Sequence, residues 1–194
     1  MTPDNHLFSQ FAHQYRASLS GTLATIDTQK VGQAIAWLRE ARELGRHIFV
    51  CGNGGSASTA SHFACDIVKG ASYKQDKRFR IMALTDSLPT LTAYSNDVSY
   101  ECVFAEQLRN FAEPNDVVMA ISGSGNSPNV IQAVQYANSI GCRTIALSGR
   151  DGGKLGPLAQ LNINVGEPHM GRIEDAHMIV CHMIGYYFME QECS

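Results

Sequence analysis

Residues 47–56 read HIFVCGNGGS, a short apolar run that ends directly in a glycine-rich turn. Such a run followed by such a turn is typical of α/β proteins, in which the turn leads from a strand into a helix. Four further apolar runs follow: 80–84 (RIMAL), 117–121 (VVMAI), 144–147 (TIAL) and 161–165 (LNINV). The first four runs of the five are nearly continuous, which predicts strands covered on both faces. The run at 161–165 alternates, which predicts an edge strand with one face toward water.

Helical segments lie between these runs. Residues 31–44 are rich in Ala, Leu, Arg and Glu, and Gly45 follows as a stop signal. Ser127 and Pro128 predict the cap and first turn of a helix that ends before Gly141. The alternation predicts an α/β fold: a doubly wound, three-layer sandwich around a parallel sheet with right-handed crossovers.

The two flanks carry more apolar surface than a solvent-exposed helix needs. An apolar stripe at helical spacing precedes the sheet: Leu7, Phe8, Phe11, Tyr15 and Leu19. Residues 173–189 predict a second long helix that is apolar on most sides. Each of these helices needs a partner, which is either the rest of the chain or another subunit.

The composition is that of an ordinary globular protein. The 194 residues are 44% hydrophobic and 17% charged, with a formal net charge of −3. We expect one domain over residues 1–194, with 1–27 as a helix used in packing or oligomerisation and 28–194 as the α/β core with its C-terminal helix. A negative net charge does not favour binding to nucleic acid or to an anionic membrane.

The sequence also predicts the compartment. The N-terminus lacks the pattern of a signal peptide, and no run approaches the length of a membrane span. Six cysteines are scattered without a CxxC pair. We therefore expect a cytoplasmic protein with reduced, mostly buried thiols.

Two glycine–serine loops follow separate strands. In 51–56, glycines let the backbone approach a ligand, and Ser56 with the N–H groups of the next helix can bind an anion. In 122–128, Ser122, Ser124 and Ser127 offer hydroxyls to a phosphate without any lysine. A tight turn with no ligand is the alternative for each loop. GNGGS lacks the Lys-Ser/Thr ending of a P-loop and the GxGxxG spacing, so no nucleotide cofactor is expected.

Four blocks in order resemble the sugar isomerase (SIS) domain family, and within it the phosphoheptose isomerases, which act on sedoheptulose 7-phosphate. They are GNGGSxxxxxHF, SNDxxYExVFxxQ, AISGSGNSPN and RIEDAHxxxxH. The resemblance runs from about residue 31 to residue 189. It implies a five-stranded, flavodoxin-like parallel sheet and a homotetramer whose active sites lie between subunits. It also implies conversion of a seven-carbon ketose phosphate to its aldose, often with zinc in the site.

The resemblance further implies the roles of particular residues. The phosphate would be held by Ser122, Gly123, Ser124 and Ser127, and the substrate contacted by Asn53, Gly54, Gly55, Asn96 and Asp97. The metal or catalytic positions are His62, Asp66, Glu174 and His182. Two of these positions depart from the family, because Asp66 replaces a Glu and Glu174 replaces a Gln. Gly70 and Gly171 replace an Arg and an Asp.

These side chains suit a divalent metal and proton transfer. His62 and Asp66 share a helix face at i and i+4, and Glu174 and His182 lie on one ridge of the last helix. If the helices converge, two imidazoles and two carboxylates form a set that zinc accepts. Each residue alone also fits a surface, capping or core role.

The chemistry that this set favours is aldose–ketose isomerisation through an enediol. It needs a base, a proton donor and stabilisation of the developing charge. We assign Asp66 or Glu174 as the base, His182 as the acid, and His62 or a metal as the group that polarises the oxygens. The alternative is a non-catalytic phosphosugar-binding regulator or scaffold, against which the retained His62, Asp66 and His182 argue.

Overall fold

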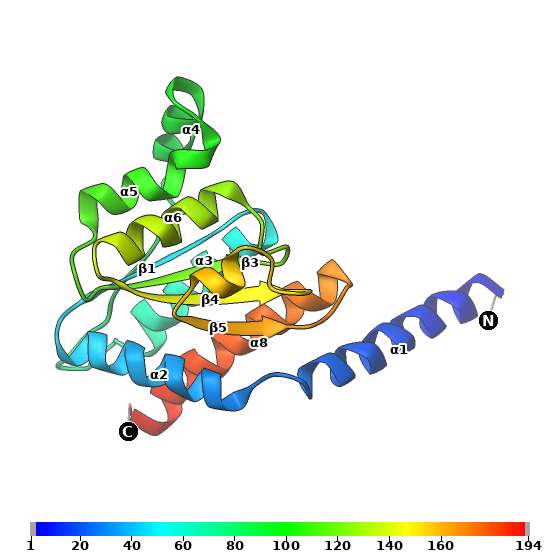
Figure 1. Cartoon of the computed structure of the whole chain (residues 1–194). Coiled ribbons are helices and arrows are strands. Elements are labelled where there is room, and N and C mark those ends of the chain that lie inside the picture. Colours follow the sequence, from blue (N-terminus) through cyan, green and yellow to red (C-terminus); the bar gives the residue numbers. More distant parts are fainter. Residues whose placement is uncertain (1–2, 193–194) are drawn as a thin grey trace.

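The computed structural model describes residues 3–192, which fold around one parallel sheet (Figure 1). Its strands are β1 (His47–Gly52), β2 (Arg80–Ala83), β3 (Val117–Ser122), β4 (Arg143–Gly149) and β5 (Leu161–Val165). The spatial order is β2-β1-β3-β4-β5, and each neighbouring pair is parallel. This order is that of flavodoxin-like sheets, so the predicted fold class and all five predicted strands are confirmed.

Helices cover both faces of the sheet. The longer helices are α1 (Pro3–Leu23), α2 (Thr28–Glu43), α3 (Gly55–Cys65), α4 (Leu88–Asp97), α5 (Val103–Phe111), α6 (Pro128–Ser139) and α8 (Met170–Tyr187). Short elements complete the chain: η1 (Asp66–Gly70), η2 (Tyr100–Cys102), α7 (Leu155–Leu158) and η3 (Phe188–Glu192). Helices α2, α3 and α8 lie on one face of the sheet, and α5 and α6 lie on the other (Figure 1).

The core consists of two apolar clusters separated by the sheet. Alternate residues of β1 point to opposite faces, as strand geometry requires. Ile48 and Val50 join the cluster under α2, α3 and α8, whereas Phe49 and Cys51 join the cluster under α5 and α6. The predicted helix at 31–44 begins earlier than expected, at Thr28, because the Asp27 carboxylate caps it by accepting from two backbone N–H groups.

The two edge strands differ from each other. On β5, Leu161, Ile163 and Val165 are buried and the asparagines between them are half-buried, as the alternation predicts. For β2 the expectation of cover on both faces is wrong, because Met82 is 40% exposed. The reason is that β2 is an edge strand and α4, which follows it, projects away from the sheet instead of lying over that face (Figure 1).

The two flanking helices, α1 and α8, differ in whether their apolar residues pack within the chain. Helix α8 buries most of one side within the chain, including Ile173, Val180 and Ile184. Helix α1 projects from the body (Figure 1), and its apolar residues Leu7, Phe8 and Phe11 are exposed. Among the helices of residues 3–192, none combines the length and the apolarity that crossing a membrane requires.

Five cysteines lie in the described part of the chain, and all five are free. Cys51, Cys142 and Cys181 are buried, Cys102 is half-buried and Cys65 is exposed. Burial raises the pKa of the Cys51 thiol to about 12 and that of Cys142 to about 11, so both remain protonated and unreactive at neutral pH. The sixth, Cys193, lies outside the described residues.

Candidate active site

The first glycine-rich loop joins β1 to α3. Gly54 takes φ +55, a left-handed conformation that favours glycine, and α3 begins at the next residue. Ser56 is buried in the first turn of the helix. The loop therefore brings free backbone N–H groups and the positive end of the helix dipole to the carboxyl edge of the sheet.

The second loop joins β3 to α6 and gathers three hydroxyls. Ser122 Oγ lies 3.5 Å from Ser124 Oγ and 3.3 Å from Ser127 Oγ. Ser127 is the residue that precedes α6, yet its hydroxyl makes no capping bond to the helix. The three hydroxyls therefore converge at the start of a helix, with Ser127 available to an anion.

The two loops enclose one cavity of about 270 Å³. Its lining is Asn53, Gly54, Gly55, Ser56, Ile121, Ser122, Gly123, Ser124, Ser127, Met170 and Glu174. The structure thus brings together eight residues predicted to bind substrate. They come from two loops that are distant in the sequence, since Ser56 and Ser122 are 66 residues apart. No lysine or arginine occurs among these described lining residues, as the loop chemistry predicts. We call this space the loop cavity.

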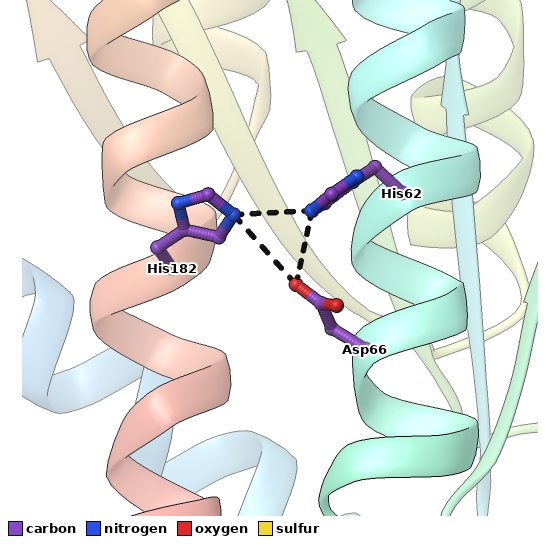
Figure 2. Close-up of side chains that lie close together, drawn as sticks. All are labelled: His62, Asp66 and His182. Carbon is purple, nitrogen blue, oxygen red and sulfur yellow. Dashed lines mark hydrogen bonds and ion pairs between the residues drawn. The ribbon is translucent and has the colours of Figure 1, made fainter.

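A second group of polar side chains lies where α3 and its continuation η1 face α8 (Figure 2). His62 Nε2 is 3.1 Å from His182 Nε2 and 3.3 Å from an oxygen of Asp66. The same Asp66 oxygen is 3.7 Å from His182 Nε2. Figure 2 shows the three side chains pointing toward a common centre. The predicted convergence of the two helices therefore holds for these three residues.

Local structure explains how α3 presents two of these groups together. The Asp66 N–H bonds to the carbonyl of His62, so their side chains lie on one face of a continuous helix. Asp66 begins η1, a π-helical turn, and such turns are frequent at functional sites. His182 completes the group from α8, and its ring also packs edge-on against Tyr186.

Glu174 lies apart from this group. It is in the first turns of α8, and its carboxylate lies over the backbone of Gly55 on the wall of the loop cavity. Glu174 and His182 share a ridge, as the spacing predicts, but eight residues of helix separate them by roughly 12 Å along the axis. Of the four predicted metal positions, the structure thus brings together His62, Asp66 and His182.

Asn96 and Asp97 are also separate from the loop cavity within this chain. Both lie at the end of α4, and the Asn96 side chain donates to Asp97 Oδ1 at 2.7 Å. Asp97 lines a different, apolar groove with Pro89, Tyr94 and Val98. Their predicted substrate contact therefore has no counterpart in the described chain and remains a prediction.

Two residues beside the loop cavity received no role from the sequence. Tyr100 donates to Asn53 Oδ1 at 2.8 Å, and Asn129 exchanges two hydrogen bonds with Asn53. Both lie in sequence blocks that carry the family resemblance, which was the one available signal. Their effect depends on contacts between distant segments, which spacing along the chain does not reveal.

His177, one turn after Glu174, faces the sheet and not the cavity. Burial lowers its pKa to about 4, although a contact between Nε2 and the carbonyl of Ser148, at 3.1 Å, acts in the opposite direction. Its imidazole is therefore neutral at pH 7 and anchors α8 on β4. It serves neither of the polar groups directly.

Comparison with known proteins identifies the family of this chain. A family model described as "SIS domain" matches residues 10–149, which is most of the chain, and the chain belongs to the SIS domain family. A probable phosphoheptose isomerase from Thermoplasma acidophilum is 44% identical over 140 residues, which cover 72% of this chain and 76% of the relative. The phosphoheptose isomerase of Helicobacter hepaticus is 38% identical over 166 residues, 86% of this chain and 84% of the relative.

Solved structures show the same relationship. The phosphoheptose isomerase from Neisseria gonorrhoeae superposes with a TM-score of 0.84 at 32% identity. The alignment covers 96% of this chain and 98% of that chain. The predicted family resemblance is therefore confirmed.

Proposed function

We propose that this protein is an aldose–ketose isomerase of sugar phosphates, with sedoheptulose 7-phosphate or a related ketose phosphate as substrate. The phosphoheptose isomerases to which it is similar support the reaction class. The observation that carries the proposal is the pairing of a hydroxyl-rich loop cavity with the His62–Asp66–His182 group along the same two helices.

The phosphate would lie in the loop cavity. Ser122, Ser124 and Ser127 supply hydroxyl donors, and the N-termini of α3 and α6 supply backbone N–H groups and favourable dipoles. The main chain around Asn53, Gly54 and Gly55 would close over the substrate. Such a site holds a dianion without a cation, which fits a chain of net charge −3.

The separation of the two groups suits a long sugar. From Gly55 to His62 on α3, and from Glu174 to His182 on α8, the helices advance roughly 10–12 Å. Six C–C bonds of about 1.5 Å span roughly 8 Å when extended, and a phosphate ester adds to this. A seven-carbon chain with its phosphate in the loop cavity would therefore bring C1 and C2 toward His62, Asp66 and His182.

Isomerisation moves a proton between C1 and C2. Asp66 would accept it from carbon as the base, or Glu174 would do so after turning away from Gly55. His182 would give a proton to the carbonyl oxygen as the acid. His62, adjacent to both, would stabilise charge on the substrate oxygens. The intact triplet of His62, Asp66 and His182 favours an enzyme over a regulator or scaffold of the same fold.

The same three residues fit a zinc ion. For Zn–N and Zn–O bonds of about 2.1 Å, the donor atoms of a tetrahedral site lie about 3.4 Å apart. The observed separations of 3.1, 3.3 and 3.7 Å bracket that value. Two imidazoles and one carboxylate leave a fourth position open, as in catalytic zinc sites. When bound, zinc would act as a Lewis acid that polarises the oxygens of the substrate. Glu174 would join this set only by turning away from Gly55.

We infer the wider setting from the family resemblance, from the exposed helix α1 and from the five free cysteines of the described residues. The chain would be a single SIS domain, assembled into a homotetramer with active sites between subunits, in the cytoplasm. Active sites of that kind would give Asn96 and Asp97 a substrate to contact across an interface, since α4 projects outward (Figure 1).

The test is turnover by the purified protein. We expect conversion of sedoheptulose 7-phosphate in a panel of five- to seven-carbon ketose phosphates, and about one zinc per site by metal analysis. Chelation should lower the rate and zinc should restore it. His182→Ala should abolish turnover, and Asp66→Glu should remain active. An absence of turnover on every sugar, in the unaltered protein and in Asp66→Glu alike, would defeat the enzyme proposal.

A further inference from the structure

The amide of Asn129 is fixed in one orientation. It lies in the first turn of α6 and is 1% exposed. Its Oδ1 accepts from the backbone N–H of Val130 at 3.0 Å, and a backbone N–H can only donate. The side-chain oxygen of Asn129 is therefore identified, and its NH₂ group must point the other way.

This orientation fixes the amide of Asn53 in turn. Asn53 Nδ2 donates to Asn129 Oδ1 at 2.8 Å, and Asn129 Nδ2 donates to Asn53 Oδ1 at 3.0 Å. The two amides form a closed pair that ties the first loop to the start of α6. The Tyr100 hydroxyl donates to the same Asn53 Oδ1 at 2.8 Å.

The hydrogen-bonding capacity of Asn53 is then almost used up. An amide oxygen accepts two bonds and an amide nitrogen donates two. Both acceptor positions are filled, by Asn129 and Tyr100, and one N–H is given to Asn129. One N–H remains, and Asn53 lines the loop cavity. The amide therefore offers that cavity a donor only, whereas the Glu174 carboxylate on the same wall offers an acceptor.

We propose that Asn129 and Tyr100 are positioning residues that hold Asn53 so that its remaining N–H donates to an oxygen of the bound sugar phosphate. This inference rests on the proposed function of the loop cavity. Tyr100 comes from the short η2 segment after α4 and Asn129 from α6, so two separate parts of the chain orient one donor in the first loop. If the amide were free to flip, half of its orientations would present an oxygen to an oxygen-rich ligand.

A double-mutant cycle tests the proposal. Tyr100→Phe removes only a hydroxyl from a side chain that is 54% exposed, so the fold should persist. We expect about a tenfold loss in kcat/KM for sedoheptulose 7-phosphate, the size of one hydrogen bond. In an Asn53→Ala background the same change should have no further effect. Asn129→Ala should also lower kcat/KM in the unaltered chain but not in the Asn53→Ala background. Its melting temperature should be measured, to distinguish a loss of folding from a loss of the orientation of the Asn53 amide.

Tyr73→Phe is the matched control, because Tyr73 is 61% exposed and its ring contacts Lys74 instead. Additive losses for Tyr100→Phe and Asn53→Ala, or no loss for Tyr100→Phe, would overturn the positioning role. Calorimetric binding of sedoheptulose 7-phosphate separates the two proposals. Binding without turnover would refute the isomerase proposal, and the double-mutant cycle would then be measured from Kd instead of kcat/KM. No binding at all defeats both.

Discussion

Gly55 and Glu174 occupy one small volume on the wall of the loop cavity. A Cβ atom built on Gly55 would lie 2.6 Å from a Glu174 carboxylate oxygen and 2.7 Å from its carboxyl carbon. Those distances are too short for any side chain other than hydrogen to share the space. The glycine therefore lets the carboxylate lie close to the first loop, on the wall of the cavity proposed to hold the sugar phosphate.

Gly55→Ala should displace Glu174 without unfolding the chain. The clash involves the end of a flexible side chain, which can rotate, and φ at Gly55 is not left-handed. A displacement of about 1 Å in a side chain that positions the substrate can lower kcat by about 100-fold. We expect a loss of that order with little change in melting temperature. Gly32→Ala, a helical glycine with open space around it, should leave kcat unchanged. An unchanged kcat in Gly55→Ala would show that the observed position of Glu174 is not needed.

The three loop serines are the proposed hydroxyl donors to the phosphate. Replacing Ser122, Ser124 and Ser127 together by Ala removes the hydroxyl donors but keeps α6, since Ser127 makes no capping bond. Hydrogen bonds to a charged group contribute about 1.5–3 kcal/mol each, so affinity for a sugar phosphate should fall by more than 100-fold. Calorimetry would measure this. Ser139→Ala at the far end of α6 is the control, and equal affinity in both variants would refute the phosphate site.

Two glycines that depart from the family pattern lie against side chains from distant parts of the chain. A Cβ atom at Gly70 would overlap the flexible end of the Met189 side chain, and one at Gly171 would lie 3.0 Å from the Tyr15 hydroxyl. Tyr15 uses that room to donate to Asp175 at 2.6 Å. The sequence showed that these glycines were unusual, but not which distant side chains fill the space. Such contacts depend on tertiary packing.

At the scale of elements, α8 serves both the core and the site. Its spacing places His182 toward α3 and His177 toward β4, while Glu174 reaches the loop cavity. The sequence predicted the helix and the ridge that Glu174 and His182 share, because periodicity fixes which side chains share a face. It predicted that these two residues meet His62 and Asp66 only if the two helices converge. It did not separate Glu174 from that group, since a shared ridge says nothing about distance along the axis.

His177 makes the stability of the folded chain depend on pH. Its pKa is about 4 in the folded chain and ordinarily about 6.5, so between these values only the unfolded chain binds the proton. The contribution to stability is therefore present above pH 6.5 and is lost as pH falls toward 4. Linkage predicts that the free energy of unfolding drops by about 2 kcal/mol from this residue between pH 7 and pH 5.

Urea denaturation at the two pH values measures this drop. His177→Gln should be less stable at pH 7, because the core is disturbed, but should lose about 2 kcal/mol less than the unaltered chain on going to pH 5. His6→Gln, on the exposed part of α1, should leave the pH dependence as it was. The same pH dependence in His177→Gln as in the unaltered chain would contradict the assignment.

Helix α1 is hydrogen-bonded to the body near its C-terminal end, whereas apolar residues near its N-terminal end are exposed. Glu167 accepts from Thr22 at 2.6 Å and pairs with Arg172 at 2.7 Å. Arg172 and then Thr22 lower the pKa of Glu167 to about 2, so the carboxylate remains charged at any physiological pH. These bonds attach the C-terminal end of α1 to the body, from which the rest of the helix projects (Figure 1). Leu7, Phe8 and Phe11 of its apolar stripe are exposed.

The exposed apolar residues of α1 are suited to packing against a second copy of the chain. Leu7, Phe8 and Phe11 are 62%, 67% and 66% exposed, and burying each such side chain contributes about 1.5–3 kcal/mol. Replacing all three by Ser should therefore convert the proposed tetramer to smaller species in analytical ultracentrifugation, with the α/β core still folded by circular dichroism. Gln10→Ser on the same helix is the control. If active sites lie between subunits, turnover should fall together with the tetramer and return at high protein concentration. A tetramer that persists in the triple variant would show that α1 does not hold the subunits together.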